Sequence, residues 1–401
     1  MSQYLLMSKE KAAKIVKNHF NFNGDLIVEE ISGGNMNVIF RVTNSKGFST
    51  IVKHSPPYIR CIGEEWPLTQ NRIITEYYSL DDFASINPKH VVKIYALNRD
   101  ENVILMEYLE GYVPWREFLI NNKNKNDFPT EIGKFMGDVY SRYFYLNLYQ
   151  DERIKIISKY ESQVMCDITS SVFFDYPYYD NENNMFDRNL INKVNDIYND
   201  NNLKEKVAKL KCKFYNKKQS LLHGDLHTGS IMVKPFNNIK VIDSEFSFYG
   251  PIGFDIGSLF GNFLLNYCAH LSSSNFIAEK RLSYLSDTWN SFVSIFTKKL
   301  EDTLPNEILC EFINEIWTDS LGYAGTEMIR RTIGVSHVDD IEFIASEDER
   351  ITAQINSLII GQYLILNANQ LSINDLGYHI KSIATADNHN ALQKKRFCRK
   401  L

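Results

Sequence analysis

The chain has 401 residues, of which 44% are hydrophobic and 23% are charged, and its formal net charge is −5. This length allows a sizeable core and two or three domain-sized units. The acidic balance, without a basic patch, argues against a nucleic-acid partner. Six cysteines form no Cys-x-x-Cys pair, which argues against a zinc ribbon or a disulfide framework and predicts a reducing, cytoplasmic setting.

The first hundred residues predict an antiparallel sheet around a glycine-bearing turn. From Ser8 onward the sequence indicates an amphipathic helix rather than a signal peptide. Strands at 28–31 and 38–42 flank the turn 32–37, whose Gly33 and Gly34 allow backbone N–H groups to approach a phosphate closely. The same Gly-Gly pair also occurs in ordinary hairpins.

A third strand, 48–54, alternates in polarity and carries Lys53. A strand lysine usually lies in solvent, but its position after the glycine turn favours a phosphate contact. A helix predicted over 68–83 carries Glu76, which either pairs with Lys53 or is a surface charge.

A second hairpin, with strands at 90–97 and 103–109, ends the sheet-forming part of the chain. We therefore expect an N-terminal unit at 1–108 and a C-terminal unit at 109–401, which is mostly helical by its hydrophobic period. The longest apolar stretch, 254–269, is interrupted by glycines and asparagines. It predicts a buried core helix and no membrane span.

Two short segments in the C-terminal unit contain the residues with the clearest chemistry. The string from His223 to Ser230 includes Asp225, and a second segment reads Asp243-Ser244-Glu245. The runs 231–233 and 239–242 between them predict a hairpin, which brings the two aspartates together. Neighbouring carboxylates repel each other and favour a divalent cation. Asp243 and Glu245 alternate by two and should share a face, whereas Ser244 points away.

These segments resemble the catalytic loop and metal-binding segment of the protein-kinase-like fold. In particular, the chain is similar to the 5-methylthioribose kinase family, which is related to the aminoglycoside phosphotransferases. Matching stretches follow in family order from about residue 30 to 340: 34–37, 57–64, 66–69, 166–169, 223–230, 243–245, 248–251, 253–257, 328–331 and 337–338. The Asp-x-Glu segment is discriminating, because most kinases of this fold carry other residues there.

The resemblance implies an α+β, two-lobed protein-kinase-like fold with an antiparallel-sheet N-lobe and a mostly helical C-lobe. It implies ATP-dependent phosphorylation of the anomeric hydroxyl of 5-methylthioribose, which gives the 1-phosphate in methionine salvage. ATP and Mg²⁺ would be the cofactors and a small sugar the substrate. No nucleic-acid or membrane partner is expected, and members of the family tend to be homodimers.

The resemblance also implies a role for each site residue. The nucleotide would be bound by the turn residues Gly34, Asn35 and Asn37, by Lys53, and by the inter-lobe hinge formed by Glu107, Tyr108 and Leu109. Asp243 and Glu245 would hold Mg²⁺. Asp225 would deprotonate or only align the sugar hydroxyl. Arg330 and Arg331 would bind the substrate or the transition state, and Asp255 resembles the aspartate that hydrogen-bonds the catalytic loop.

Two departures from the family pattern leave the conformation of the glycine turn and the number of Mg²⁺ ions open. The placement of the arginine pair is a separate question. Ser32 replaces the first glycine of the usual turn, and Ser230 stands where many relatives of the fold carry a metal-binding asparagine, which leaves a second Mg²⁺ open. Neighbouring helix residues project about 100° apart. Arg330 and Arg331 therefore both reach a site only at a helix end or bend, which Gly334 permits.

Two other functions are compatible with the sequence. One is a kinase for another small acceptor, such as a different 5-modified ribose, an aminoglycoside or choline. The arginine pair favours a neutral sugar over a substrate with several ammonium groups, but the 5-substituent stays open. The other is an ATP-binding pseudokinase, and the presence of Lys53, Asp225, Asp243 and Glu245 argues against it.

Overall fold

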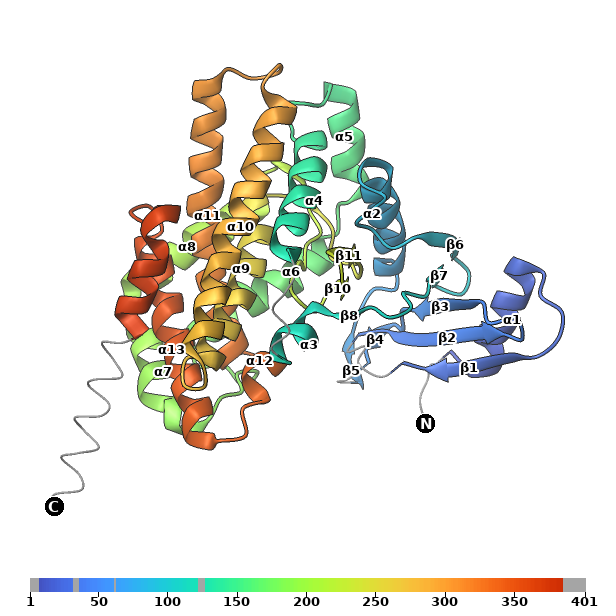
Figure 1. Ribbon diagram of the computed structural model, residues 1–401, viewed down its shortest axis with the longest axis horizontal. Helices are drawn as coiled ribbons and strands as arrows, with labels where there is room; N and C mark the ends of the chain where they lie inside the picture. The colour runs from blue at the N-terminus through green and yellow to red at the C-terminus, as the bar shows by residue number, and fades with distance from the viewer. Residues whose placement is uncertain (1–6, 32–35, 61–62, 122–126, 385–401) are drawn as a thin grey trace.

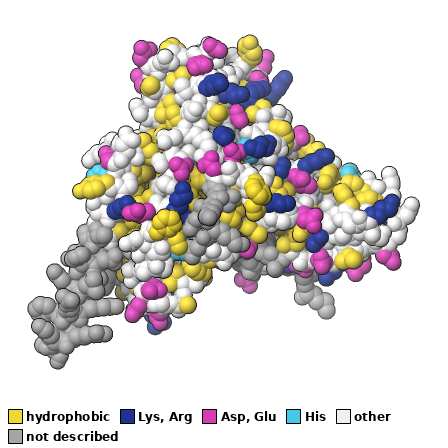
Figure 2. Space-filling model, in the orientation of Figure 1, with side chains coloured by type: hydrophobic (Ala, Val, Ile, Leu, Met, Phe, Trp, Pro, Cys, Tyr) yellow, Lys and Arg dark blue, Asp and Glu magenta, His cyan; other side chains and the backbone are white. Residues whose placement is uncertain are grey.

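A computed structural model describes residues 7–31, 36–60, 63–121 and 127–384. It has a small sheet-containing part and a larger helical part, joined beside the hairpin of β10 (Ile231–Lys234) and β11 (Asn238–Val241) (Figure 1). On the face in Figure 2, positive and negative side chains are interspersed. Within the described residues, no helix is long and apolar enough to cross a bilayer.

The N-terminal part is built on a five-stranded antiparallel sheet in the order β1-β2-β3-β7-β6. Its strands are β1 Leu26–Glu30, β2 Val38–Asn44, β3 Ser49–His54, β6 Ile94–Asn98 and β7 Val103–Glu107. Helix α1 (Lys9–Phe20), which Ser8 caps, packs on one face, and α2 (Arg72–Ile86) covers the other. Lys53 is paired with Ile104 and therefore points to the α2 face.

The predicted strand at 90–97 begins later than expected, at Ile94. Its first residues lie outside the sheet and bond to β11 of the β10–β11 hairpin instead. Val241 N–H donates to the His90 carbonyl at 2.7 Å, and Val92 N–H donates to the Val241 carbonyl at 3.2 Å. A short hairpin that the apolar pattern did not predict, β4 (Tyr58–Ile59) with β5 (Gly63–Pro67), follows β3.

The predicted catalytic hairpin is present as β10 (Ile231–Lys234) and β11 (Asn238–Val241). The outer edge of β10 pairs with β8 (Val113–Pro114), which follows the segment predicted as the hinge. A separate pair is formed by β9 (Ser220–Leu221) and β12 (Tyr249–Gly250). Both edges of the hairpin are therefore hydrogen-bonded to segments that adjoin the connection between the two parts.

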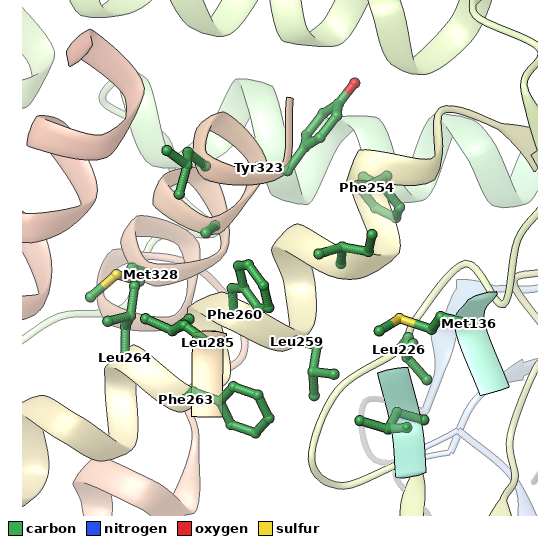
Figure 3. Close-up of a cluster of buried hydrophobic side chains, with 14 of the residues drawn as sticks. Met136, Leu226, Phe254, Leu259, Phe260, Phe263, Leu264, Leu285, Tyr323 and Met328 are labelled. Atoms are coloured by element: carbon green, nitrogen blue, oxygen red, sulfur yellow. The ribbon is translucent and has the colours of Figure 1, made fainter. Parts of the chain in front are cut away.

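The helical part surrounds α9 (Ile252–His270), in which every residue is buried. Figure 3 shows α9 side chains, Phe260 and Phe263 among them, packed among residues of neighbouring helices. The helical part also contains α3 Trp115–Ile120, α4 Phe128–Arg142, α5 Gln150–Lys159, α6 Gln163–Ser170, α7 Ile191–Asn199, α8 Asn201–Asn216, α10 Asn275–Leu300, α11 Asn306–Ile333, α12 Asp339–Glu342 and α13 Glu347–Asn367, and residues 373–384 are helical as well. The described residues of this part also form a π-helical turn, Ser171–Asp175, and 3₁₀ turns at Tyr176–Tyr178 and Arg188–Leu190. The predicted core helix is thus confirmed.

Glycines on α9 allow α11 to approach closely. Gly253, Gly257 and Gly261 are spaced four residues apart and share a face. A Cβ on Gly257 would lie 2.6 Å from the Ser320 carbonyl oxygen, and one on Gly261 would lie 2.7 Å from Glu327 Cβ. This close packing brings the last turn of α11 beside the loop that carries Asp225.

Candidate active site

Asp255 holds the loop that carries Asp225. Its carboxylate accepts hydrogen bonds from the backbone N–H of His223 at 2.7 Å and of Gly224 at 3.0 Å, and from Tyr140 Oη at 2.6 Å. The predicted contact of Asp255 with the loop backbone is therefore confirmed. Its position in the first turn of α9 follows Pro251, the residue at the helix N-cap.

The loop has a conformation that only a glycine fits at position 224. Gly224 has φ +85°, and a Cβ there would lie 2.0 Å from the Phe246 carbonyl oxygen. Ser230 Oγ accepts from His227 N–H at 3.0 Å and lies 2.9 Å from the Asp225 carbonyl oxygen. The Ser230 hydroxyl is thus bonded within its own loop.

Lys53 links the sheet, α2 and the segment after β11. It is 4% exposed, its Nζ lies 2.7 Å from Glu76, and it also contacts Asp243 Oδ1. Burial opposes its charge, but Asp243, Glu76 and Glu245 outweigh this effect and raise the pKa of Lys53. Of the two alternatives for Glu76, the pair with Lys53 is the one observed.

The β10–β11 hairpin brings the segments of Asp225 and Asp243 together: Ile242 N–H donates to the Ser230 carbonyl at 3.0 Å, and Asp225 lies close enough for its charge to act on the pKa of Asp243. Asp243 is not a glycine but has φ +67°, a backbone conformation that is uncommon for such residues and found at functional sites. His223 Nε2 lies 2.9 Å from the Ile242 carbonyl oxygen and joins the loop to this segment. The predicted juxtaposition of the two aspartates is therefore confirmed.

Asp225 lies beside a histidine and two arginines. His227 Nε2 is 3.4 Å from Asp225 Oδ2. Burial alone raises the pKa of Asp225, but His227, Arg331 and Arg330 outweigh it and hold the pKa well below its ordinary value. Gly229 N–H donates to His227 Nδ1 at 2.9 Å, so Nε2 carries the hydrogen that faces Asp225 in the neutral imidazole.

Arg330 and Arg331 face the same site because both pair with one carboxylate. They occupy the last turn of α11, which ends before Gly334, as predicted. Arg330 Nε lies 2.5 Å from Glu327 Oε2, and Arg331 Nε lies 2.9 Å from Glu327 Oε1. The spacing of three and four residues places both arginines over Glu327. Asn262 of α9 also donates to Glu327 Oε1, at 2.9 Å.

Glu245 is buried between Arg72 and Asn37. Glu245 Oε1 accepts from Asn37 Nδ2 at 2.9 Å, and Oε2 lies 2.9 Å from Arg72 Nε, outside hydrogen-bond geometry. Arg72 Nη2 donates to Asn37 Oδ1 at 3.1 Å. Asn37, predicted from the turn, is thus bonded to the Asp-x-Glu segment. The turn residues Gly34 and Asn35 lie outside the described residues.

The segment predicted as the hinge, 107–109, begins at the last residue of β7. Glu107 N–H donates to the Lys93 carbonyl at 2.9 Å, and the Leu109 carbonyl accepts from Tyr112 N–H at 3.2 Å. The Arg41 guanidinium lies 4.1 Å from the centroid of the Tyr108 ring, a cation–π contact that connects β2 to this segment.

Asp243 and Glu245 have the donor chemistry for a divalent cation. Their carboxylate oxygens are hard ligands, and Mg²⁺ usually takes one or two such groups besides nucleotide phosphates. The Asp243 side chain is 42% exposed and has a second oxygen beyond the one at Lys53. Glu245 Oε2 is a buried oxygen that has no hydrogen bond, although Arg72 Nε lies 2.9 Å away. The residues present therefore fit Mg²⁺.

Comparison with known proteins gives a consistent result. The model of the phosphotransferase enzyme family matches residues 27–289. A methylthioribose kinase from Enterobacter sp. is 35% identical over 387 residues, which cover 92% of this chain and 96% of that protein. A methylthioribose kinase from Yersinia enterocolitica is 37% identical over 364 residues, which cover 87% of this chain and 90% of that protein.

The chain belongs to the methylthioribose kinase family. The expected resemblance is thus confirmed, and so is the two-lobed α+β fold of the phosphotransferase family. Membership in the methylthioribose kinase family also makes the chain a kinase.

Several polar residues of the candidate site could not be predicted from the sequence of this methylthioribose kinase family member. Arg72, Ser79, Asn262 and Glu327 are single polar residues within helices, and each bonds to a partner far along the chain or to a neighbouring turn. Only the spacing of Glu327 with the arginine pair, at i+3 and i+4, was a local signal.

Proposed function

We propose that the chain phosphorylates methylthioribose on its anomeric hydroxyl with ATP, and so produces the 1-phosphate in methionine salvage. The observation that carries this proposal is the similarity to methylthioribose kinases over about nine-tenths of the chain. The site agrees with it, because Asp225 faces two buried arginines and a histidine.

In the proposed reaction, Asp225 accepts the proton of the sugar hydroxyl or aligns that hydroxyl. The hydroxyl oxygen forms a bond to the γ-phosphorus of ATP, and the bond from phosphorus to the ADP oxygen breaks. The low pKa of Asp225 keeps it ionised at neutral pH, which suits an aligning group in a loose transition state. Arg330 and Arg331 would stabilise negative charge on the transferring group.

We assign the nucleotide to the other end of the site. Lys53 would contact its phosphates, with Glu76 fixing the lysine. The turn residues Gly34, Asn35 and Asn37 would cover it, and Glu107, Tyr108 and Leu109 would face the adenine. Asp243 and Glu245 would hold Mg²⁺, which supplies charge neutralisation at the phosphates.

The proposal extends to the organisation of the chain. Residues 1–108 would form the N-lobe with the nucleotide lysine, and residues 109–401 the C-lobe with the catalytic loop, metal segment and sugar site. The family resemblance supports a homodimer, and the cysteine pattern supports a cytoplasmic location.

An ADP-release assay tests the proposal. ATP and Mg²⁺ would be supplied with methylthioribose, ribose, 5-deoxyribose, choline or kanamycin as the acceptor. We expect strong turnover with methylthioribose and little with the others. Turnover confined to another acceptor would keep the phosphotransferase mechanism and reject the substrate, and binding of ATP without turnover on any acceptor would support a pseudokinase.

A further inference from the structure

One face of α2 contacts each residue of the Asp243-Ser244-Glu245 segment, directly or through one side chain. Arg72, Glu76 and Ser79 are spaced as i, i+4 and i+7, so they lie on the same side of the helix. All three are buried, with exposures of 1%, 0% and 0%. Polar side chains are rarely buried to this extent without a specific partner.

The first contact fixes Ser244, the residue that points away from the predicted metal ligands. Ser79 Oγ lies 2.6 Å from Ser244 Oγ and 3.2 Å from the Ser244 carbonyl oxygen, in a buried environment. Because Ser244 lies between the two carboxylates, this contact sets the position of the backbone that carries both of them.

The other two contacts reach the carboxylates themselves. Glu76 reaches Asp243 through Lys53. Arg72 faces Glu245 Oε2, while Asn37 donates to Oε1. Because Arg72 also donates to Asn37 Oδ1, these three side chains form a closed set.

Arg72 is suited to this arrangement by its fixed fork of donors. Besides Asn37, it donates to the carbonyl oxygens of Thr69 at 2.8 Å and Met36 at 3.3 Å. A lysine keeps the charge but has no planar fork, so it cannot reproduce these directions. A buried ion pair is a weak source of stability, whereas groups that hold a metal ligand from behind orient it for the ion.

We propose that the α2 face formed by Arg72, Glu76 and Ser79 positions the metal-binding segment, and that Arg72 is a positioning residue for Glu245. The cation that accompanies the nucleotide then meets two carboxylates already held in place. This inference rests on the proposed use of Mg²⁺ by Asp243 and Glu245. It adds Arg72, Ser79 and Ser244 to the residues on which metal affinity depends.

Calorimetric titration of ADP, with and without Mg²⁺, tests the inference in the variants Arg72→Gln, Arg72→Lys, Ser79→Ala and Ser244→Ala. We expect both arginine variants to weaken Mg²⁺ binding about 10- to 100-fold, a larger loss than the one in ADP affinity without Mg²⁺, which reports on the Asn37 contact of Arg72 alone. Ser85→Ala is the matched control, because Ser85 is exposed on the same helix and its hydroxyl donates to the Asp82 carbonyl rather than to the Asp243-Ser244-Glu245 segment.

The two serines provide a test that does not depend on Arg72. The hydroxyls of Ser79 and Ser244 bond to each other, so either substitution removes the same contact. The double variant, Ser79→Ala with Ser244→Ala, should therefore lose no more Mg²⁺ affinity than the more affected of the two single variants. If the arginine variants fail to fold, as judged by circular dichroism, the comparison of the single and double serine variants tests the inference instead. Unchanged Mg²⁺ affinity in folded variants, or an equal loss of ADP binding with and without Mg²⁺, would overturn the inference.

The assay needs no acceptor and no turnover. A wild-type protein that binds Mg²⁺ with ADP but does not phosphorylate methylthioribose would reject the proposed substrate and leave the α2 inference intact. If the wild-type enzyme phosphorylates methylthioribose and all these variants bind Mg²⁺ as tightly as it does, the proposed substrate stands and the α2 inference is rejected.

Discussion

Glu327 illustrates how one buried side chain orients two others. Its two oxygens pair with Arg330 and Arg331, which would otherwise point in different directions from the helix. Burial raises the pKa of Glu327, but the two arginines outweigh it, and the net shift is downward. The carboxylate is therefore ionised at neutral pH and fixes the positive charge that faces Asp225.

Replacement of Asp225 tests the reacting end of the site. We expect Asp225→Ala to lower kcat by about 10²- to 10⁴-fold, the usual contribution of a positioned acid–base group. The KM for ATP should change little, because Asp225 lies at the acceptor end. Asp225→Asn is the size-matched variant, and steady-state ADP release is the measurement. An Asn variant as active as wild type would rule out both a base and a charged aligning group at this position.

The aspartates and Lys53 could be predicted from the sequence because short local motifs carry them. Glu76 could be predicted only as one of two alternatives, since the spacing of a lone glutamate does not reveal its partner. Arg72 and Ser79 could not be predicted. Their contacts with Ser244 and Glu245 span more than 150 residues of the chain, and no local pattern distinguishes them from exposed helix residues.

At the scale of elements, hydrophobic period predicted the strands and α9 to within a few residues. It failed where backbone pairing, rather than side-chain burial, decides the structure. Val91 and Val92 are apolar enough to form the start of β6, but the backbone of residues 90–92 bonds to β11 instead. The β4–β5 hairpin was missed because its strands are short and Glu64 and Glu65 break the apolar alternation.

Asp255 joins α9 to the catalytic loop, so its removal should destabilise the protein. Asp255→Ala leaves three buried donors without their acceptor, and we expect the free energy of unfolding to fall by at least about 2 kcal/mol. Asp255→Asn keeps one acceptor oxygen and should cost less. Urea unfolding followed by circular dichroism measures both. Equal stability of the Ala variant and wild type would show that the loop does not depend on this anchor.

The contact of α9 with α11 leads to a prediction at Gly261. The new Cβ of Gly261→Ala would press on Glu327, so we expect a loss of about 1–3 kcal/mol in stability and a higher KM for the sugar. Gly377→Ala is the control, because a Cβ there meets nothing within 4 Å. The control should be neutral or stabilising by up to about 1 kcal/mol. If both variants behave alike, close packing at Gly261 does not position the arginines.

At the scale of the whole molecule, buried titratable groups outside the site make stability depend on pH. His270, at the end of α9, is 2% exposed, and burial lowers its pKa to about 4. An unfolded chain binds this proton below about pH 6.5, whereas the folded protein resists it down to about pH 4. Stability should therefore fall as the pH decreases through this window.

His270→Gln tests this contribution, because glutamine does not titrate. We expect the free energy of unfolding of the variant to decline less than that of wild type between pH 7 and pH 5. The difference should be partial, since burial also lowers the pKa of His54 and His90. Parallel pH profiles of the two proteins in urea unfolding would show that His270 contributes nothing.

The pairing of both edges of the β10–β11 hairpin has a consequence for protein engineering by recombination. The hairpin bonds on one side to β8 and on the other to residues 90–92, which lie on either side of residue 108. A chimera that joins two relatives at that point would mix parents within one backbone ladder. A crossover placed after the start of α9 would take every strand of this ladder from the same parent. Chimeras designed to exchange acceptor preference between relatives should therefore be joined there.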